Sequence, residues 1–386
     1  MQTWIHYLLI FAIAFAATIA FVPLVRRFAK AHGIVDEPGP RRVNRRPVPR
    51  LGGVAMFGGL LVAVIVEYVC ERTGLWHGPL YIPGEVNVRS IGVLVGLAVV
   101  VAVGIIDDVR NLGPGTKFLG QLLASCIIAA TGTILHTFQI PGSSAVIDFG
   151  FWAYPITVIY LVCFINIINL IDGLDGLAAG ITGMAAITLF IMFMTLHQTE
   201  AALLAAITAA IAGAFLVYNF YPASIFMGDS GSMLLGLLLG SVSLVGTTRL
   251  LSITLLIVPI IVALIPIIDT AAAIVRRLRK HESIATPDAG HIHHRLLLRG
   301  YSQRKAVLLI YLWTAFLCVG TLLMWTLGGA AKMVIFTLLL VASAVIVYKI
   351  GLFDPVRQRH GRSGVIYDTN GIDPDHESGN DERHGT

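Results

Sequence analysis

Residues 90–112 read SIGVLVGLAVVVAVGIIDDVRNL. The uncharged run, residues 90–106, is followed directly by two adjacent carboxylates, Asp107 and Asp108. The run is close to the ~20 residues that a membrane-spanning helix needs. Acids beside hydrocarbon are costly and therefore suggest a functional site. A like-charged pair at this depth is unfavourable without a cation, although a solvated helix end would also account for it.

The same pattern of long apolar runs recurs along the chain and predicts eleven spans. These are residues 4–25, 52–70, 90–106, 117–135, 152–170, 177–196, 200–219, 230–247, 252–274, 306–326 and 331–350. The 386-residue chain is 56% hydrophobic and 13% charged, whereas a soluble domain is about a quarter charged. We therefore predict an all-α integral membrane protein, a polytopic bundle of about eleven transmembrane helices.

The distribution of basic residues predicts the orientation. With the N-terminus outside, outer segments hold Arg72, Arg89, Arg249 and Lys332, and the other 23 of the 27 Lys and Arg residues lie inside. Cytoplasmic segments of membrane proteins are enriched in Lys and Arg. We therefore expect an outside N-terminus and a cytoplasmic C-terminus. No small-residue cleavage site follows the first span, so a cleaved signal peptide is not expected.

The chain divides into one transmembrane domain, residues 1–353, and a polar tail, residues 354–386. The tail lacks apolar periodicity, and we expect it to be disordered and cytoplasmic. The cysteines lie in or beside spans without paired spacing, so they are interpreted as packing residues rather than disulfide partners or metal ligands. They are Cys70, Cys126, Cys163 and Cys318.

Two further acidic motifs follow predicted spans on the same membrane face. In Asn169-Leu-Ile-Asp172-Gly-Leu-Asp175-Gly the acids are three residues apart and share a face if the segment is helical. A capped turn, with Asp175 as N-cap of the next helix, is the structural alternative. In Phe226-Met-Gly-Asp229-Ser-Gly, Asp229 or Ser230 could be an N-cap. The same position suits phosphate binding and Mg²⁺.

Basic and histidine motifs occupy the longest inner loops. His291-Ile-His293-His294 is interpreted as donating hydrogen bonds to a diphosphate, with a solvated histidine run as the alternative. The surrounding acids favour Mg²⁺ or Mn²⁺ over zinc. A basic loop reads Arg41-Arg-Val-Asn-Arg45-Arg-Pro-Val-Pro-Arg50. Its arginines could bind a lipid phosphate, or they could set the membrane topology and attract anionic lipid headgroups. Arg276 and Arg277 share this ambiguity.

Several acids, a divalent cation and basic clamps together favour phosphoryl transfer at a membrane face. From about Gly33 to Arg299 the sequence resembles the polyprenyl-phosphate N-acetylhexosamine-1-phosphate transferases, and within them the bacterial undecaprenyl-phosphate N-acetylglucosamine branch. The motifs that carry this resemblance are Asp36-Glu-Pro, Pro47-Val-Pro-Arg-Leu-Gly-Gly53, Asp107-Asp108, Asn169 to Gly176, Phe226 to Gly231, and Pro287-Asp288 through His291-Ile-His-His294. The family pattern Arg-Lys-x-His reads Arg41-Arg42-Val43-Asn44 here, which keeps the charge and loses the histidine.

The resemblance implies transfer of a sugar 1-phosphate from a UDP-sugar to polyprenyl phosphate, with release of UMP, at the cytoplasmic face of a bacterial inner membrane. Asp107, Asp108, Asp172, Asp175 and Asp229 are the predicted catalytic residues. Asp107, Asp108 and Asp229 are also the predicted ligands of Mg²⁺, with Mn²⁺ as a substitute. The predicted substrate-binding residues are Asp36, Arg41, Arg42, Arg45, Arg50, Lys117, Asn169, Arg276, Arg277, His291, His293 and His294.

The expected partners are a UDP-sugar, a polyprenyl phosphate and the membrane, with a homodimer allowed for and no nucleic acid. N-acetylglucosamine is the favoured sugar. A phospho-N-acetylmuramoyl-pentapeptide transferase, or another UDP-sugar specificity, stays open. An ion-coupled transporter is the alternative from another class, but such proteins place acids at mid-bilayer. Here the acids lie at span ends.

Overall fold

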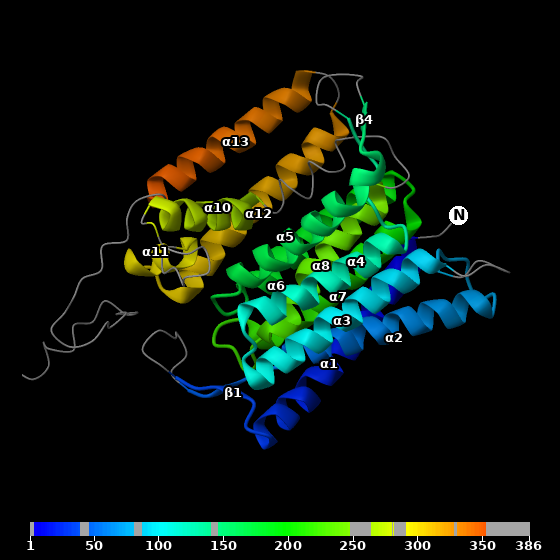
Figure 1. Ribbon diagram of the computed structural model, residues 1–386, viewed down its shortest axis with the longest axis horizontal. Coiled ribbons are helices and arrows are strands. Elements are labelled where there is room, and N and C mark those ends of the chain that lie inside the picture. Colours follow the sequence, from blue (N-terminus) through cyan, green and yellow to red (C-terminus); the bar gives the residue numbers. More distant parts are fainter. Residues whose placement is uncertain are drawn as a thin grey trace, which may run out of the picture.

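The computed structural model describes residues 4–38, 46–80, 87–139, 146–247, 264–279, 281, 291–327 and 330–352. These residues fold almost entirely into helices (Figure 1). The helices are α1 Trp4–Ala31, α2 Gly52–Arg72, α3 Val88–Arg110, α4 Pro114–Ala130, the 3-10 turn η1 Gly150–Trp152, α5 Ala153–Ile171, α6 Leu177–Thr195, α7 Thr199–Asn219, α8 Gly228–Thr247, α10 Leu264–Arg279, α11 Ile292–Leu298, α12 Gln303–Thr326 and α13 Ala330–Ile350. The predicted tail at 354–386 lies outside the described residues.

Two small hairpins accompany the helices. Strand β1, Val35–Asp36, pairs antiparallel with β2, Val48–Pro49. Strand β3, Thr137–Gln139, pairs antiparallel with β4, Val146–Asp148. The all-α prediction therefore holds for the architecture and omits two minor hairpins in the connecting segments.

Nine helices within the described residues are long and apolar enough to cross a membrane. They correspond to nine of the eleven predicted spans. The span predicted at 117–135 is α4, a 17-residue helix of about 26 Å. That length falls just short of a ~30 Å hydrocarbon core. Residues 252–263 of the remaining predicted span lie outside the described residues, and 264–274 belong to α10.

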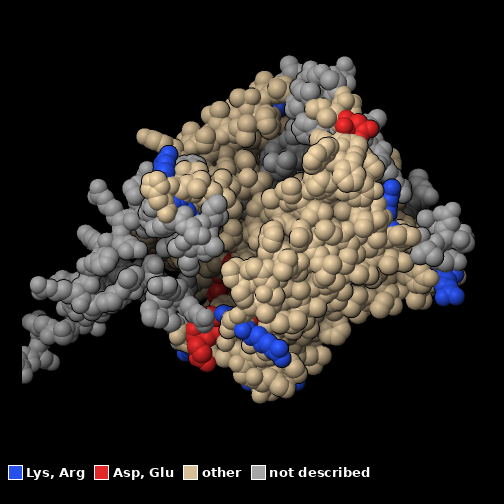
Figure 2. All heavy atoms as spheres, viewed as in Figure 1, with Lys and Arg blue, Asp and Glu red and all other residues tan. Residues whose placement is uncertain are grey.

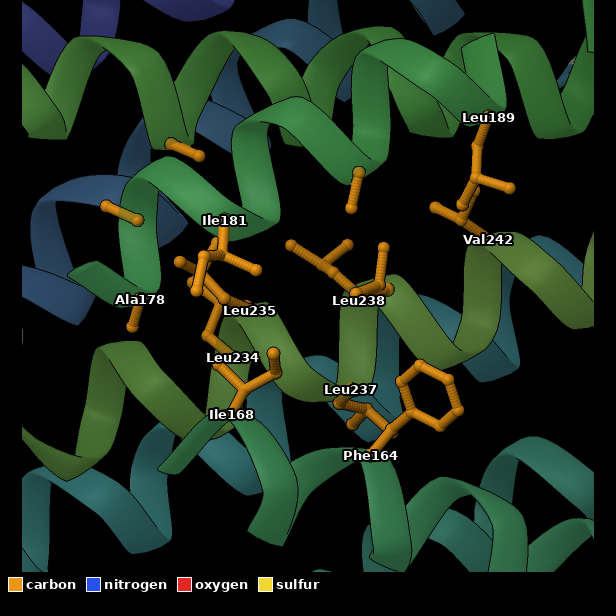
Figure 3. Close-up of a cluster of buried hydrophobic side chains, with 14 of the residues drawn as sticks. Phe164, Ile168, Ala178, Ile181, Leu189, Leu234, Leu235, Leu237, Leu238 and Val242 are labelled. Atoms are coloured by element: carbon orange, nitrogen blue, oxygen red, sulfur yellow. The ribbon is translucent and has the colours of Figure 1, made fainter. Parts of the chain in front are cut away.

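Helix α8 is the centre of the bundle. It packs against α2, α3, α5, α6 and α7, and 89% of its apolar, membrane-spanning stretch is buried, compared with 17% for that of α13. Figure 3 shows α8 side chains such as Leu234 and Leu238 between Ile168 of α5 and Ile181 of α6. Figure 2 shows the outer surface of the bundle, which is broadly uncharged, with charged residues at its edges.

Close packing around α8 depends on two glycines. A Cβ placed on Gly53 of α2 would meet the Ser230 and Gly231 backbone, and one on Gly104 of α3 would meet the backbone of Ser230 and Asp229. Both glycines therefore let a neighbouring helix approach the start of α8 directly. As a result, the start of α2, the end of α3 and the start of α8 meet at one end of the bundle, called the site end below.

Candidate active site

Asp108 caps the helix that carries Asp229. Its Oδ1 accepts a hydrogen bond from the Asp229 amide at 2.8 Å, and its Oδ2 accepts from the Ser230 amide at 3.2 Å and from Ser230 Oγ at 2.7 Å. The first amides of a helix lack partners within the helix, and a carboxylate there is also favoured by the helix dipole. The cap on α8 is therefore supplied by α3. The predicted alternative, in which Asp229 or Ser230 caps its own helix, is not what the structure contains.

Asp107 points to a different partner. Lys117, near the start of α4, places its Nζ 3.0 Å from Asp107 Oδ2 and 2.8 Å from Asp229 Oδ2. Asn169 of α5 donates a 2.5 Å hydrogen bond to Asp229 Oδ1. Four helices thus bring two carboxylates together around one cation. The two adjacent acids of the pair differ in environment, because successive helical residues point about 100° apart.

Asp175 and Asn219 join the loop after α5 to the segment before α8. Asp175 Oδ2 accepts from the Ala223 amide at 2.9 Å. Asn219 accepts from the Gly176 amide and donates to the Ile225 carbonyl, each at 3.0 Å. Gly176, with φ 81°, is the N-cap of α6, so Asp175 does not cap that helix. Burial raises the pKa of the Asp175 carboxyl above its usual value.

Asp172 has a different environment from the other acids, because it accepts no hydrogen bond from any described residue. It ends α5 as the C-cap. Burial, followed by the charges of Asp229, Asp108 and Asp175, raises its pKa to about 8. Without a ligand, the carboxyl therefore holds a proton at neutral pH and can donate a hydrogen bond.

Two of the sequence motifs pair through their backbones. The Phe226 amide donates to the Pro49 carbonyl at 2.8 Å, and the amides of Gly52 and Gly53 donate to the carbonyls of Phe226 and Met227 at 3.1 and 3.0 Å. Beside this junction Arg50 forms an ion pair with Asp36 across the β1–β2 hairpin. The hairpin is thus fastened to the segment that leads into α8.

A cavity of about 400 Å³ opens at the site end. This lies in the range of small-molecule sites. Its walls are lined by Asp36, Arg50, Asp108, Asn169, Asp172, Gly173, Leu174, Asp175, Asn219, Phe226, Met227, Gly228, Asp229 and His294. Eight predicted site residues are among them. Asp107 and Lys117 are not, and they reach the cavity through Asp229.

The three histidines occupy different positions. His294 lines the cavity. His293 is buried against the loop after α5, where a Cβ on Gly173 would strike its ring. Burial, and then the neighbouring His294 and His291, lower the pKa of His293 well below its usual value. His291 pairs with Asp269 at 2.9 Å. The alternative of a solvated histidine run is wrong for His291 and His293, since both are buried.

The predicted arginines are only partly placed. Arg276 donates to the Leu352 carbonyl at 2.6 Å, at the end of α13, and Arg277 is a buried neighbour. Neither is among the residues that line the cavity. Arg41, Arg42 and Arg45 lie outside the described residues.

Sequence reasoning missed three polar residues that organise this end. Ser230 is predicted only as a possible cap, and neither Asn219 nor Asp269 is predicted as a site residue. The detectable signal was an uncompensated polar side chain beside a long apolar run. Their hydrogen-bond partners could not be predicted from the sequence, because these partners are distant in the chain: Asn219, for example, bonds to Gly176, 43 residues away.

The donor set suits a hard divalent cation. Asp107 and Asp229 already share one cationic group, the Lys117 ammonium. Among the described residues no group of three or more His, Cys, Asp or Glu could hold a metal. Mg²⁺ commonly needs only one or two carboxylates, with phosphate and water completing its shell. The site therefore fits Mg²⁺ bound together with a phosphate ligand.

Comparisons with known proteins show which family the chain is similar to. Residues 90–247 match the model of glycosyl transferase family 4. The chain is 33% identical over 311 residues to a probable undecaprenyl-phosphate N-acetylglucosaminyl 1-phosphate transferase of Bacillus subtilis, covering 81% of this chain and 83% of that protein.

Two further relatives are named for the transfer of different groups. A decaprenyl-phosphate N-acetylglucosaminephosphotransferase of Mycolicibacterium smegmatis is 35% identical over 319 residues, 77% of this chain and 76% of that protein. A phospho-N-acetylmuramoyl-pentapeptide-transferase of Halalkalibacterium halodurans is 30% identical over 323 residues, 80% of this chain and 92% of that protein. The chain belongs to the polyprenyl-phosphate N-acetylhexosamine-1-phosphate transferases, as its motifs predicted.

Proposed function

We propose that this membrane protein transfers N-acetylglucosamine 1-phosphate from UDP-N-acetylglucosamine to a polyprenyl phosphate and releases UMP. The observation that carries the proposal is the acid-lined cavity at the start of α8, where Asp229 meets Asp107 and Lys117. Identity to relatives named for N-acetylglucosamine transfer supports this sugar. The product would start a lipid-linked cell-envelope glycan.

We assign the metal ligands to Asp229 and Asp107. Mg²⁺ bound there would offset negative charge on the diphosphate. Asp108 is assigned a different task, because both of its oxygens are engaged by the start of α8. It holds the helix that presents Asp229. The proposal thus gives the two adjacent acids, Asp107 and Asp108, different roles.

The remaining cavity residues bind and orient the reactants. The lipid phosphate oxygen attacks the sugar-bearing phosphorus directly, and UMP leaves. A phosphate monoester has a second pKa near 6, so little general-base help is required at neutral pH. Asp172, His294 and Arg50 line the same cavity wall and can form hydrogen bonds with the donor substrate. Asp175 and Asn219 keep that wall in place.

We propose that the site end faces the cytoplasm of a bacterial cell, with eleven spans, the N-terminus outside and a cytoplasmic tail at 354–386. The distribution of Lys and Arg supports this orientation. Both substrates fit it, since nucleotide sugars are cytoplasmic and the lipid lies in the membrane.

A transfer assay tests the reaction. Purified protein in detergent, with undecaprenyl phosphate and Mg²⁺, should release UMP from UDP-N-acetylglucosamine and not from UDP-N-acetylmuramoyl-pentapeptide. EDTA should abolish release, and Mg²⁺ or Mn²⁺ should restore it. Equal turnover of the pentapeptide donor would move the chain to the other sugar branch. Full activity in chelator would remove the metal from the proposal.

Single cysteines test the orientation. In a background with Cys70, Cys126, Cys163 and Cys318 replaced, Leu75→Cys should react with a membrane-impermeant maleimide on intact cells. Ser302→Cys should react only after permeabilisation. Leu75 is 74% exposed in the segment after α2, and Ser302 is the exposed N-cap of α12. The reverse pattern would place the cavity on the outer face.

A further inference from the structure

One buried acid at the site end has no part in the reaction proposed above. Asp269 lies in α10 and is 3% exposed. Its Oδ1 accepts a hydrogen bond from the Ile292 amide at 2.8 Å, and its Oδ2 pairs with His291 Nδ1 at 2.9 Å. Both oxygens of a carboxylate buried away from water are thereby satisfied, which is what makes such burial tolerable.

The bonds made by Asp269 anchor α11, a helix of seven residues. A helix this short is not stable by itself. Its N-cap is His291, whose side chain makes no capping bond. The first amide, that of Ile292, would therefore lack a partner. Asp269 supplies that partner from a separate helix.

Helix α11 in turn presents two histidines to the cavity loop. His293 is 3% exposed and lies directly against Gly173, while His294 lines the cavity. The rings of His291 and His293 are parallel with centroids 5.8 Å apart, and those of His293 and His294 are 4.3 Å apart. A continuous row of rings therefore leads from Asp269 to the cavity wall.

The same pair determines the tautomer of His291. A carboxylate oxygen can only accept, so Nδ1 carries the proton and Nε2 keeps a lone pair when the ring is neutral. An amide at position 269 that still accepts from Ile292 would turn its NH₂ toward Nδ1. His291 would then have to give up the Nδ1 proton.

We propose that Asp269 is a positioning residue that holds the histidine helix α11 against the catalytic loop and fixes the tautomer of His291. The inference rests on the proposed transfer reaction, because it assigns α11 to that reaction's substrate site. Asp269 itself does not line the cavity. It acts through His291 and the Ile292 amide.

Two variants separate the two bonds. Asp269→Ala removes both acceptors. Asp269→Asn keeps an oxygen acceptor for the Ile292 amide but places an NH₂ donor, instead of an acceptor oxygen, opposite His291 Nδ1. Thr270→Val, the next residue of α10, is the matched control, because Thr270 makes no hydrogen bond with the described residues of α11. Each variant is made in the full-length chain.

Hydrogen exchange of the substrate-free protein gives a readout independent of activity. In Asp269→Ala, amides 292–298 should exchange at least ~10-fold faster, with α5 and α12 unchanged. In Asp269→Asn, this protection should be largely kept. In both, kcat for UMP release should fall ~10–100-fold, the range of loss typical when a carboxylate that orients a metal-binding histidine is removed, with the KM for the UDP-sugar within about threefold. Thr270→Val should match wild type throughout.

Two results would overturn the proposal. One is wild-type exchange over 292–298 in Asp269→Ala. The other is a loss of protection spread evenly over α5, α10 and α12, which would make Asp269 a general packing residue. If Asp269→Ala does not fold, a wild-type kcat in Asp269→Asn is sufficient to refute it. Should the wild type release no UMP at all, the proposed function fails, while the exchange data still decide whether Asp269 anchors α11.

Discussion

Two groups of buried acids lie at opposite ends of α2, and they differ in kind. At the site end, beside Gly53, five aspartates line a cavity of about 400 Å³, and a sixth, Asp107, shares Lys117 with one of them. At the other end, ~20 Å along the helix, Glu67 is fully buried. Its Oε2 pairs with His6 at 2.7 Å and accepts from Trp76 at 3.1 Å. Its neighbour Glu71 accepts from the Leu80 amide at 3.2 Å.

The comparison shows which features distinguish a site for chemistry from a structural network. Burial and like charge are common to both groups. Only the site end combines a cavity, a cation shared between two carboxylates, and an acid, Asp172, that accepts no hydrogen bond from a described residue. The acids at the far end fasten α1 and the segment after α2 to α2. Removing charge should therefore affect rate at one end and stability at the other.

The largest effect is expected from Asp229→Asn. The change keeps size and hydrogen bonding but removes one of the two carboxylates that share Lys117, so kcat for UMP release should fall by ~10³ or more. The melting temperature should stay near that of wild type, because Asn can still accept from Asn169. Steady-state kinetics and thermal melting of the purified variant measure both. Normal specific activity with poor expression would make Asp229 a structural residue.

Asp108→Asn should differ from Asp229→Asn by affecting both rate and stability. Asn offers one acceptor where the start of α8 uses two oxygens. A lost helix cap costs about 1 kcal/mol, and a displaced Asp229 should lower kcat ~10–100-fold. The same two assays apply. An unchanged melting temperature with a loss equal to that of Asp229→Asn would return Asp108 to the metal-binding group.

The arrangement of the site end was only partly predictable from the sequence. The motifs correctly indicated the family, and the acids of α3, α8 and the end of α5 do meet at one end of the helix bundle. The motifs could not assign roles within Asp107-Asp108, because the partners of Asp108 are 121 and 122 residues away. The histidine motif was found, but its burial depends on Asp269 and Gly173, which meet it only in three dimensions. Hydropathy likewise could not fix the length of α4.

Glu67→Gln is the counterpart at the far end. Glu67 lies on the same helix as Gly53 but far from the cavity, so UMP release should stay within about twofold of wild type. The protein should lose roughly 1–2 kcal/mol of stability, because a charge-assisted bond with His6 becomes a neutral one. Thermal melting beside the transfer assay tests this. A rate loss comparable to that of Asp108→Asn would abolish the distinction between the two ends.

A further effect, at Asp172, depends on pH. Its pKa of about 8 lies above the ~3.9 expected for an unfolded chain, so the folded state binds the proton more tightly. Its contribution to stability is therefore complete below pH 4 and is lost as pH rises through 8. Asp172→Asn carries no such group. In EDTA and without substrate, its melting temperature should exceed that of wild type increasingly from pH 5 to 8, and then level off. The limit is about 1.4 kcal/mol per pH unit, reduced by solvent in the open cavity. A difference that does not vary with pH would contradict the shift.

The cap that α3 places on α8 has a consequence for biogenesis. Asp108 and the amide of Asp229 are 121 residues apart in the chain, and synthesis at ~5–20 residues per second separates them by roughly 6–24 s. During that time Asp107 can pair with Lys117, ten residues further along the chain, but Asp108 has none of its helical partners. Water must solvate the Asp108 carboxylate, and water is available only at the membrane face. The position of the pair at the end of α3, rather than within it, lets the helix enter the bilayer before the residues that will bind it exist.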